Sequence, residues 1–287
     1  MANEMQQKLL VVRMHISKWN PWGYDKQTAE RVAQEEGAKK GDVHTTKRKI
    51  SKEAIKKITD ITSNAYAYHL EMTMPSGTEG DRLITTDLYE KYCNKMGEYK
   101  NQLNAALDEF VPQYPTWVAE ARERLKGLFK EADYPSASQI RGKFSITYNF
   151  LPLPSADNLT VNLMNGQLAQ VRKSVEEEMK RISETAMGSL WDRVHENIAR
   201  MAEKLGDNDA IFRNSLVGNV KDLCEVLKSL NFRNDPDLEA MRLRIETRLA
   251  GHDPEELRKF RNIREEVANE AKAIMVEISE KRKLRVE

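Results

Sequence analysis

The longest uninterrupted helical pattern of the chain runs from Thr160 to Leu205. A helix of this length restricts the folds that the rest of the chain can adopt. No proline interrupts it, and Gly206 follows as a typical C-cap. Apolar or small residues recur along it at a mean spacing of about 3.7, the period of a straight or slightly right-handed helix. At 1.5 Å per residue the helix would be about 68 Å long, whereas a compact globule of this chain length has a diameter of about 50 Å. We therefore predict a helix that projects or bends, with Gly188-Ser189 as the best bend site.

The apolar stripe of this helix has two interpretations. A broad stripe usually forms the core of a helical bundle, but it also forms contacts between copies of a chain. The side chains that continue or widen the stripe in its second half are candidate interface residues: Met187, Trp191, Val194 and Ile198. Both interpretations stay open at this point, because the sequence does not show which surface covers the stripe.

Most of the remaining chain also has helical patterns. The strongest start signal is Asp253, an N-cap followed by Pro254 at the first helical position and by Glu256 of a capping box. Asp25 and Ser51 are further N-cap candidates, and Gly37 ends the helix that Asp25 begins. The predicted helices are Asp25 to Gln34, Ser51 to before Pro75, Thr86 to Phe110, Pro115 to Leu128, Ile211 to Leu230, Pro236 to Leu249, and Asp253 to the basic C-terminus.

Three short segments have the composition or alternation of β-strands, namely Lys8–Lys18, Val43–Ile50 and Phe144–Leu151. Pro152 and Pro154 end the last of them. We therefore predict a mainly α protein, a long-helix bundle with a small, about three-stranded antiparallel sheet in the N-terminal half. The composition shift after the prolines suggests two domains, an α+β domain over residues 1–155 and a helical hairpin or bundle over residues 156–287.

The composition excludes several classes of protein. Forty-six basic and 45 acidic residues give a net charge of +1, with +3 on residues 1–155 and −2 on residues 156–287. Cys93 and Cys224 form no CxxC motif, and the five histidines have no metal-ligand spacing, so we predict neither a disulfide framework nor a metal site. The polar N-terminus and the lack of a long apolar run predict a cytoplasmic protein without a membrane partner.

No catalytic motif is present. The chain has no glycine-rich phosphate loop between a strand and a helix, and no nucleophile elbow. We therefore predict a protein that is not an enzyme and binds no cofactor. A hydrolase with dispersed carboxylates remains a further alternative, because carboxylates distant in sequence can meet in the fold.

A basic and aromatic cluster near the N-terminus supports a binding function. Its residues are Trp19, Trp22, Lys39, Lys40, Lys47, Arg48 and Lys49. Lysines with exposed aromatic rings form surfaces for nucleic acid, since the cations contact phosphates and the rings stack on bases. The alternative is structural: the charges line an exposed sheet edge, and the tryptophans anchor the strand in the core.

The order of motifs in the N-terminal half also suggests a family. Trp19-Asn-Pro-Trp22-Gly23, Thr73-Met-Pro75, Gly80-Asp-Arg-Leu83, Tyr134-Pro135 and Leu151-Pro-Leu-Pro154 occur in this order. Over residues 8–160 the chain resembles an uncharacterised phage and bacterial family. In that family the neighbouring genes often encode a MoxR-like AAA+ ATPase and a von Willebrand A-type, cobaltochelatase-like protein. The resemblance therefore implies a non-enzymatic component of a phage-associated machine. It supplies no catalytic residues.

Two functional hypotheses follow. The first is a non-enzymatic, phage-associated helical scaffold or adaptor in the host cytoplasm, which forms homo-oligomers and has an AAA+ ATPase as a candidate partner. The second is a nucleic-acid-binding module that uses the basic and aromatic N-terminal cluster.

Overall fold

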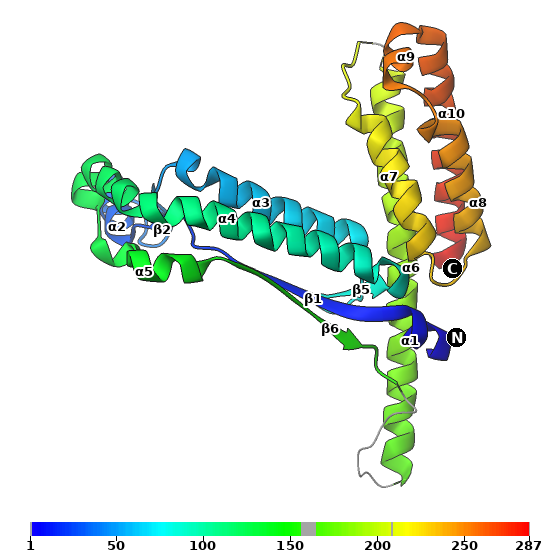
Figure 1. Cartoon of the computed structure of the whole chain (residues 1–287), viewed down its shortest axis with the longest axis horizontal. Coiled ribbons are helices and arrows are strands. Elements are labelled where there is room, and N and C mark those ends of the chain that lie inside the picture. The colour runs from blue at the N-terminus through cyan, green and yellow to red at the C-terminus, as the bar shows by residue number, and fades with distance from the viewer. Residues whose placement is uncertain (1, 156–164, 208, 287) are drawn as a thin grey trace. The chain divides into compact units, whose positions relative to one another are not determined.

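The computed structural model describes residues 2–155, 165–207 and 209–286 (Figure 1). Over these residues the protein is mainly α-helical, with a four-stranded sheet and a two-stranded ribbon, so the predicted fold class is confirmed. Residues 160–164 of the predicted long helix lie outside the described part.

Packing divides the chain into two compact units, and both are discontinuous in sequence. Unit 1 comprises Met1–Arg13, Leu70–Glu90 and Asn149–Glu287, whereas unit 2 comprises Met14–His69 and Lys91–Tyr148. The predicted division into residues 1–155 and 156–287 does not match these units. The reason is that segments of the N-terminal half pack on the C-terminal helices. Arg193, for example, donates a hydrogen bond to the carbonyl of Leu70 at 3.0 Å.

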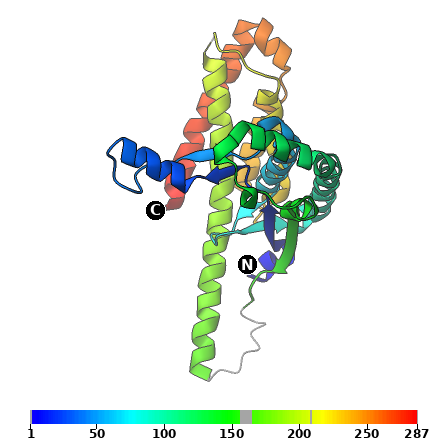
Figure 2. The same cartoon turned by 90° about the vertical axis from the view of Figure 1, so that its left-hand side faces the viewer.

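Unit 1 contains a bundle of helices. Its members are α6 (Asn165–Gly206), α7 (Ser215–Leu230), α8 (Pro236–Ile245, continued by a π-helical turn over Glu246–Ala250), α9 (Pro254–Lys259) and α10 (Arg261–Val286). In both views α10 runs beside α6 (Figures 1 and 2). The core contains Leu190 and Leu205 of α6 with Ala271 and Ile274 of α10, all fully buried.

Arg264 closes the C-terminal end of α6. This buried α10 side chain donates hydrogen bonds to the carbonyls of Lys204 and Leu205 at 2.9 and 3.1 Å, and to those of Asp207 and Ala210 at 2.5 and 2.9 Å. The last carbonyls of a helix have no partner within the helix. One guanidinium therefore provides donors for four carbonyls at the end of the helix and just beyond it, of which the bond to Leu205 is buried and the others are partly buried. The helix itself runs without interruption through Gly188-Ser189.

The four-stranded sheet has the order β4 (Met74–Pro75), β5 (Asp81–Thr85), β1 (Leu9–Ser17) and β6 (Ser145–Pro152). Antiparallel pairing aligns Leu9 with Thr85 and Arg13 with Asp81, and the Arg13–Asp81 pair also forms a salt bridge of 2.5 Å. The predicted strands at residues 8–18 and 144–151 correspond to β1 and β6, whereas β4 and β5 are additional. The third prediction corresponds to β3 (Thr46–Arg48), which pairs with β2 (Trp22–Tyr24) in a separate ribbon.

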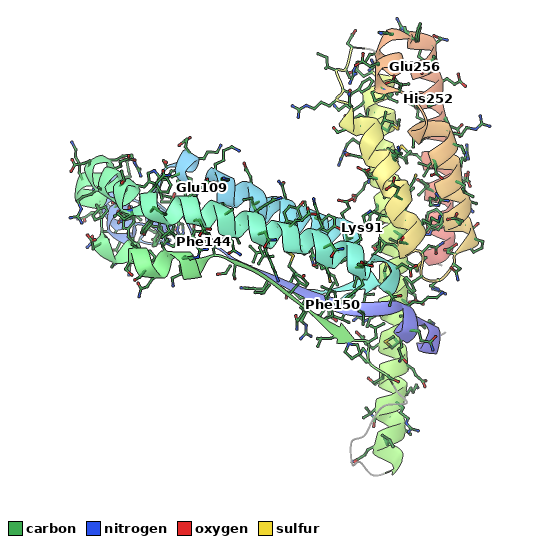
Figure 3. The ribbon with its side chains drawn as sticks, viewed as in Figure 1. Lys91, Glu109, Phe144, Phe150, His252 and Glu256 are labelled. Carbon is green, nitrogen blue, oxygen red and sulfur yellow. The ribbon has the colours of Figure 1, made fainter. Side chains whose placement is uncertain are left out.

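Unit 2 contains most of two long helices, α3 (Lys52–Met72) and α4 (Thr86–Leu125). They lie side by side in opposite directions. Lys57 pairs with Glu109, labelled in Figure 3, at 2.6 Å, and the rings of Tyr68 and Tyr92 stack 6.1 Å apart further along. Shorter elements complete the unit: α2 (Lys26–Glu35), α5 (Ala137–Ile140) and three 3₁₀ turns at Lys126–Leu128, Glu131–Asp133 and Arg141–Lys143.

The predicted N-caps Asp25, Ser51 and Asp253 are confirmed, but two predicted helix boundaries are not. Asp25 accepts the backbone N–H of Thr28, and Ser51 accepts that of Ala54. The predicted break before Pro115 is wrong, because α4 continues through Pro112 and Pro115. Both prolines are exposed, whereas Tyr114 between them is buried, so packing maintains the helix there. Conversely, the predicted C-terminal helix is divided at Phe260, where the backbone is extended.

Candidate nucleic-acid interface

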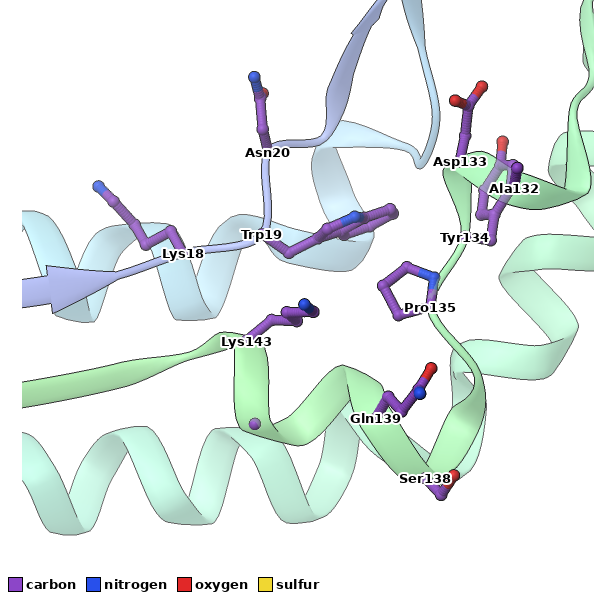
Figure 4. A pocket seen from close by; sticks show the side chains of 11 residues that line it. Lys18, Trp19, Asn20, Ala132, Asp133, Tyr134, Pro135, Ser138, Gln139 and Lys143 are labelled. Carbon is purple, nitrogen blue, oxygen red and sulfur yellow. The ribbon is translucent and has the colours of Figure 1, made fainter.

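Trp19, at the end of β1, is a core residue of unit 2. It is buried, and its ring contacts the rings of Tyr114 and Tyr134 with centroids 5.9 and 6.2 Å away. The ammonium of Lys49 also lies over this ring, 4.9 Å from its centroid. Trp19 is only 8% exposed, although it is one of the residues that line a hollow of unit 2 (Figure 4), so the structure favours a core role for it over the predicted role in nucleic-acid stacking. The structural alternative, a tryptophan that anchors the strand end, describes its environment.

Lys47 and Lys49 are buried as well. Lys47 Nζ donates to the Leu128 carbonyl at 2.6 Å and forms a 2.8 Å ion pair with Asp133. Desolvation by burial lowers the pKa of Lys49. Neither ammonium is available to a phosphate, so the predicted roles of these two lysines are wrong. Their side chains alternate with Arg48, which the strand places on the opposite face.

Trp22 and Arg48 remain on the surface. The two residues are paired across the β2–β3 ribbon, and the guanidinium carbon of Arg48 lies 4.3 Å from the centroid of the Trp22 ring. Trp22 is 44% exposed and Tyr24, on the same ribbon, is 54% exposed. An arginine held over an exposed indole provides a cation and an aromatic surface at one position. Lys39 and Lys40 are exposed too, and Lys40 pairs with Glu30 at 3.1 Å.

Three hollows of unit 2 adjoin the segment Lys18–Trp22. The first, shown in Figure 4, has a volume of about 770 Å³, and Lys18, Asn20 and Lys143 are among its lining residues. The second, of about 370 Å³, lies beside Trp22 and Arg48. The third, of about 380 Å³, is lined by Lys18 and by residues of β1 and α3. Lys18 lines both the first and the third hollow, and we refer to the three hollows together as the basic groove.

One face of α3 forms a wall of the second and third hollows. Its lining residues follow the helical spacing of three or four, and they are Lys52, Ile55, Lys56, Thr59, Asp60, Thr62, Ser63 and Tyr66. Ile55 and Thr62 are buried at the base, whereas Lys52, Lys56 and Tyr66 are exposed. The basic groove therefore combines exposed cations with two exposed aromatic rings, Trp22 and Tyr66.

Acidic side chains in the basic groove are neutralised. Asp60 pairs with Lys56, and Asp133 pairs with the buried Lys47. The cations at the rim are five: Lys18, Arg48, Lys52, Lys56 and Lys143. Sequence reasoning identified only Arg48 among them. The helical spacing of Lys52, Lys56, Ser63 and Tyr66 was the available signal, since it places polar residues on one exposed face.

The two units also differ in net charge. Unit 2 has 20 basic and 14 acidic residues, a net charge of +6, whereas unit 1 has 26 basic and 31 acidic residues, a net charge of −5. The linear halves differ far less, because residues 70–90 alone contribute one basic and five acidic side chains to unit 1. A positive unit attracts polyanions over a distance of about one Debye length, roughly 8 Å at physiological salt.

The predicted interface on α6 lies inside unit 1. Met187 is 3% exposed, Trp191 1%, and Val194 and Ile198 are fully buried. The interface assignment is therefore corrected to a core assignment, because the side chains of the bundle already cover this stripe. A second copy of the chain has no access to it in the folded state.

Among the residues described, no group of three or more histidine, cysteine or acidic side chains is arranged to hold a metal ion. Within the same residues, no helix combines the length and apolar character needed to cross a membrane. No family model, characterised protein or solved structure matches this chain. The family resemblance and the partners that it implies therefore stay predictions.

Proposed function

We propose that this chain is a non-enzymatic protein that binds single-stranded nucleic acid in the basic groove of unit 2. The observation that carries the proposal is the exposed Trp22 ring with Arg48 over it, in the second hollow, together with four lysines that line this hollow and the first. Proteins that bind single strands combine such cations, which follow the phosphates, with aromatic rings on which bases stack. The positive charge of unit 2 supports the same proposal.

A single strand fits this surface better than a duplex. The aromatic rings of Trp22 and Tyr66 are available to unstacked bases, whereas the bases of a duplex are stacked on one another. The groove residues of α3 from Lys52 to Tyr66 extend over about 21 Å at 1.5 Å per residue, enough for several nucleotides. The proposed recognition depends on phosphates and ring faces, so it carries little sequence preference.

Fluorescence anisotropy with a labelled 20-nucleotide oligothymidylate tests this function. We expect binding at about 50 mM salt, and Trp22→Ala should weaken it by about 5- to 150-fold, since stacking of one base is worth about 1–3 kcal/mol. Phe260→Ala is the matched control, because Phe260 is a 50% exposed aromatic residue of unit 1. No binding of the wild type at this salt, or equal effects of the two substitutions, would contradict the proposal.

A scaffold or adaptor role that includes self-association is the second candidate. The apolar stripe on α6 does not support self-association, because it is buried in unit 1. Two apolar side chains of unit 1 are exposed, however: Ile211 is 95% exposed and Phe260 is 50% exposed. The two residues adjoin segments that already contact each other, since Arg258 donates to the Phe212 carbonyl at 3.1 Å. A strict monomer by light scattering at micromolar concentration would remove this candidate. The AAA+ ATPase partner and the phage association remain predictions from the resemblance alone.

A further inference from the structure

Unit 1 contains a cavity of about 470 Å³ that the proposed nucleic-acid function does not use. Three elements line it: α1 (Ala2–Lys8), the middle of α6, and the turn between α7 and α8. Its lining residues are Met5, Lys8, Glu176, Met179, Lys180, Ser183, Glu184, Phe232, Arg233 and Asn234. The volume is within the range of small-molecule sites, about 300–1,000 Å³.

The base of the cavity is apolar. Met5, Met179 and Phe232 are each less than 9% exposed, and each comes from a different element. Methionine side chains are flexible and polarizable, so they adapt to apolar ligands of different shapes. The base therefore suits an aliphatic or thioether side chain.

The turn that forms one wall is held in place before any ligand binds. Asn231 accepts the backbone N–H of Asp235 at 2.8 Å and donates to the Asp235 carbonyl at 3.0 Å. Asn234 has a positive φ of 50°, and Lys8 Nζ donates to the Phe232 carbonyl at 3.3 Å. A wall fixed in this way reduces the ordering cost of binding.

The charges at the rim have opposite signs on different elements. Arg233 of the turn and Lys8 of α1 provide cations, whereas Glu176 of α6 provides a carboxylate. Lys180 and Glu184 form an ion pair with each other at 3.9 Å. A ligand that is complementary to this rim has both a carboxylate and an ammonium group, together with an apolar portion for the base.

We propose that this cavity binds a free α-amino acid with an apolar side chain, such as methionine or leucine. The ligand carboxylate pairs with Arg233 and Lys8, its ammonium pairs with Glu176, and its side chain packs on Met179 and Phe232. This site is separate in unit and in ligand chemistry from the basic groove, so either proposal can fail without the other.

Isothermal titration calorimetry of the full chain with L-methionine tests the proposal. For a ligand of this size we expect a Kd on the order of 0.1–1 mM. N-acetyl-L-methionine lacks the ammonium charge and L-methioninamide lacks the carboxylate, so each should bind at least tenfold more weakly. Glycine lacks the side chain and should not bind measurably. No binding of methionine or leucine at 10 mM, or binding of either blocked derivative as tight as that of methionine, would overturn the proposal.

Two substitutions of exposed residues separate the charge contributions without threatening the fold. Glu176→Gln should remove the preference for the free ammonium, and Arg233→Gln should remove the preference for the free carboxylate. Glu177→Gln and Arg172→Gln are the matched controls, because both residues are exposed on α6 and lie outside the cavity lining. If the controls change the two preferences as much as the cavity variants do, the assigned roles of Glu176 and Arg233 are wrong.

Discussion

The salt dependence of nucleic-acid binding gives the sharpest test of the basic groove. Five cations line its rim, all exposed except Arg48, which is half-buried. If each contacts one phosphate of a single strand, the slope of log K against log salt concentration is about −3.5, at about −0.7 per contact. Raising the salt concentration from about 50 to 200 mM should then weaken binding by about 100-fold.

The double substitution Lys52→Gln and Lys56→Gln should leave three contacts. The slope then falls to about −2.1, and the same change in salt weakens binding by only about 20-fold. The assay is fluorescence anisotropy of the labelled oligothymidylate over this range of sodium chloride. Lys221→Gln with Lys259→Gln is the matched control, because it removes two exposed lysines of unit 1 and should keep the wild-type slope. An unchanged slope in the Lys52 and Lys56 double variant would refute the assignment of the groove.

Three further predictions concern stability and reactivity. Arg264→Met should lower the free energy of unfolding by about 3 kcal/mol in urea denaturation, because it leaves one buried and three partly buried carbonyls without this donor. Arg261→Gln on the exposed face should change the same free energy by less than about 0.5 kcal/mol. Trp191→Leu should lower the free energy of unfolding by about 2–4 kcal/mol in the same assay, since the indole is a core group. It should leave the oligomeric mass unchanged. A change of mass without a loss of stability would instead indicate that Trp191 lies in an interface between copies of the chain. Burial raises the pKa of Cys224 to about 11, so the thiolate forms more readily in the unfolded chain than in the folded one. The contribution of this thiol to the free energy of unfolding is full below about pH 9. It should fall as the pH rises towards 11. The expected fall is on the order of 2 kcal/mol and should be absent in Cys224→Ala; an equal fall in this variant would assign it to other groups.

The caps and long helices could be predicted from the sequence because their causes are local. Asp25 and Asp253 accept backbone N–H groups two or three residues later, so a few adjacent residue types specify each helix start. β5 was not predicted, because only its last residues, from Leu83 to Thr85, are buried, and the strand forms by pairing with β1, about 70 residues earlier in the chain. Such pairing leaves no periodic signal in the segment itself.

The candidate site was predicted only in part, and the reason is the alternation of side chains along a strand. Lys47, Arg48 and Lys49 are equivalent in a count of charges, but only Arg48 reaches the surface. A sequence pattern shows that neighbours point to opposite faces, but it does not show which face is covered. The same limit applies to Trp19 and Trp22, and to the buried stripe of α6.

The interleaved connectivity of the two units has a practical consequence for deletion analysis. β1, α3, α4 and β6 each contribute residues to both units. A truncation after residue 155 would remove the helices on which Leu70–Glu90 packs and would expose side chains that are otherwise fully buried, among them Met74 and Leu83. Functions of this protein will therefore have to be assigned by point substitution in the intact chain. The insolubility of a fragment would reflect the loss of packing partners and would say nothing of the function of the deleted residues.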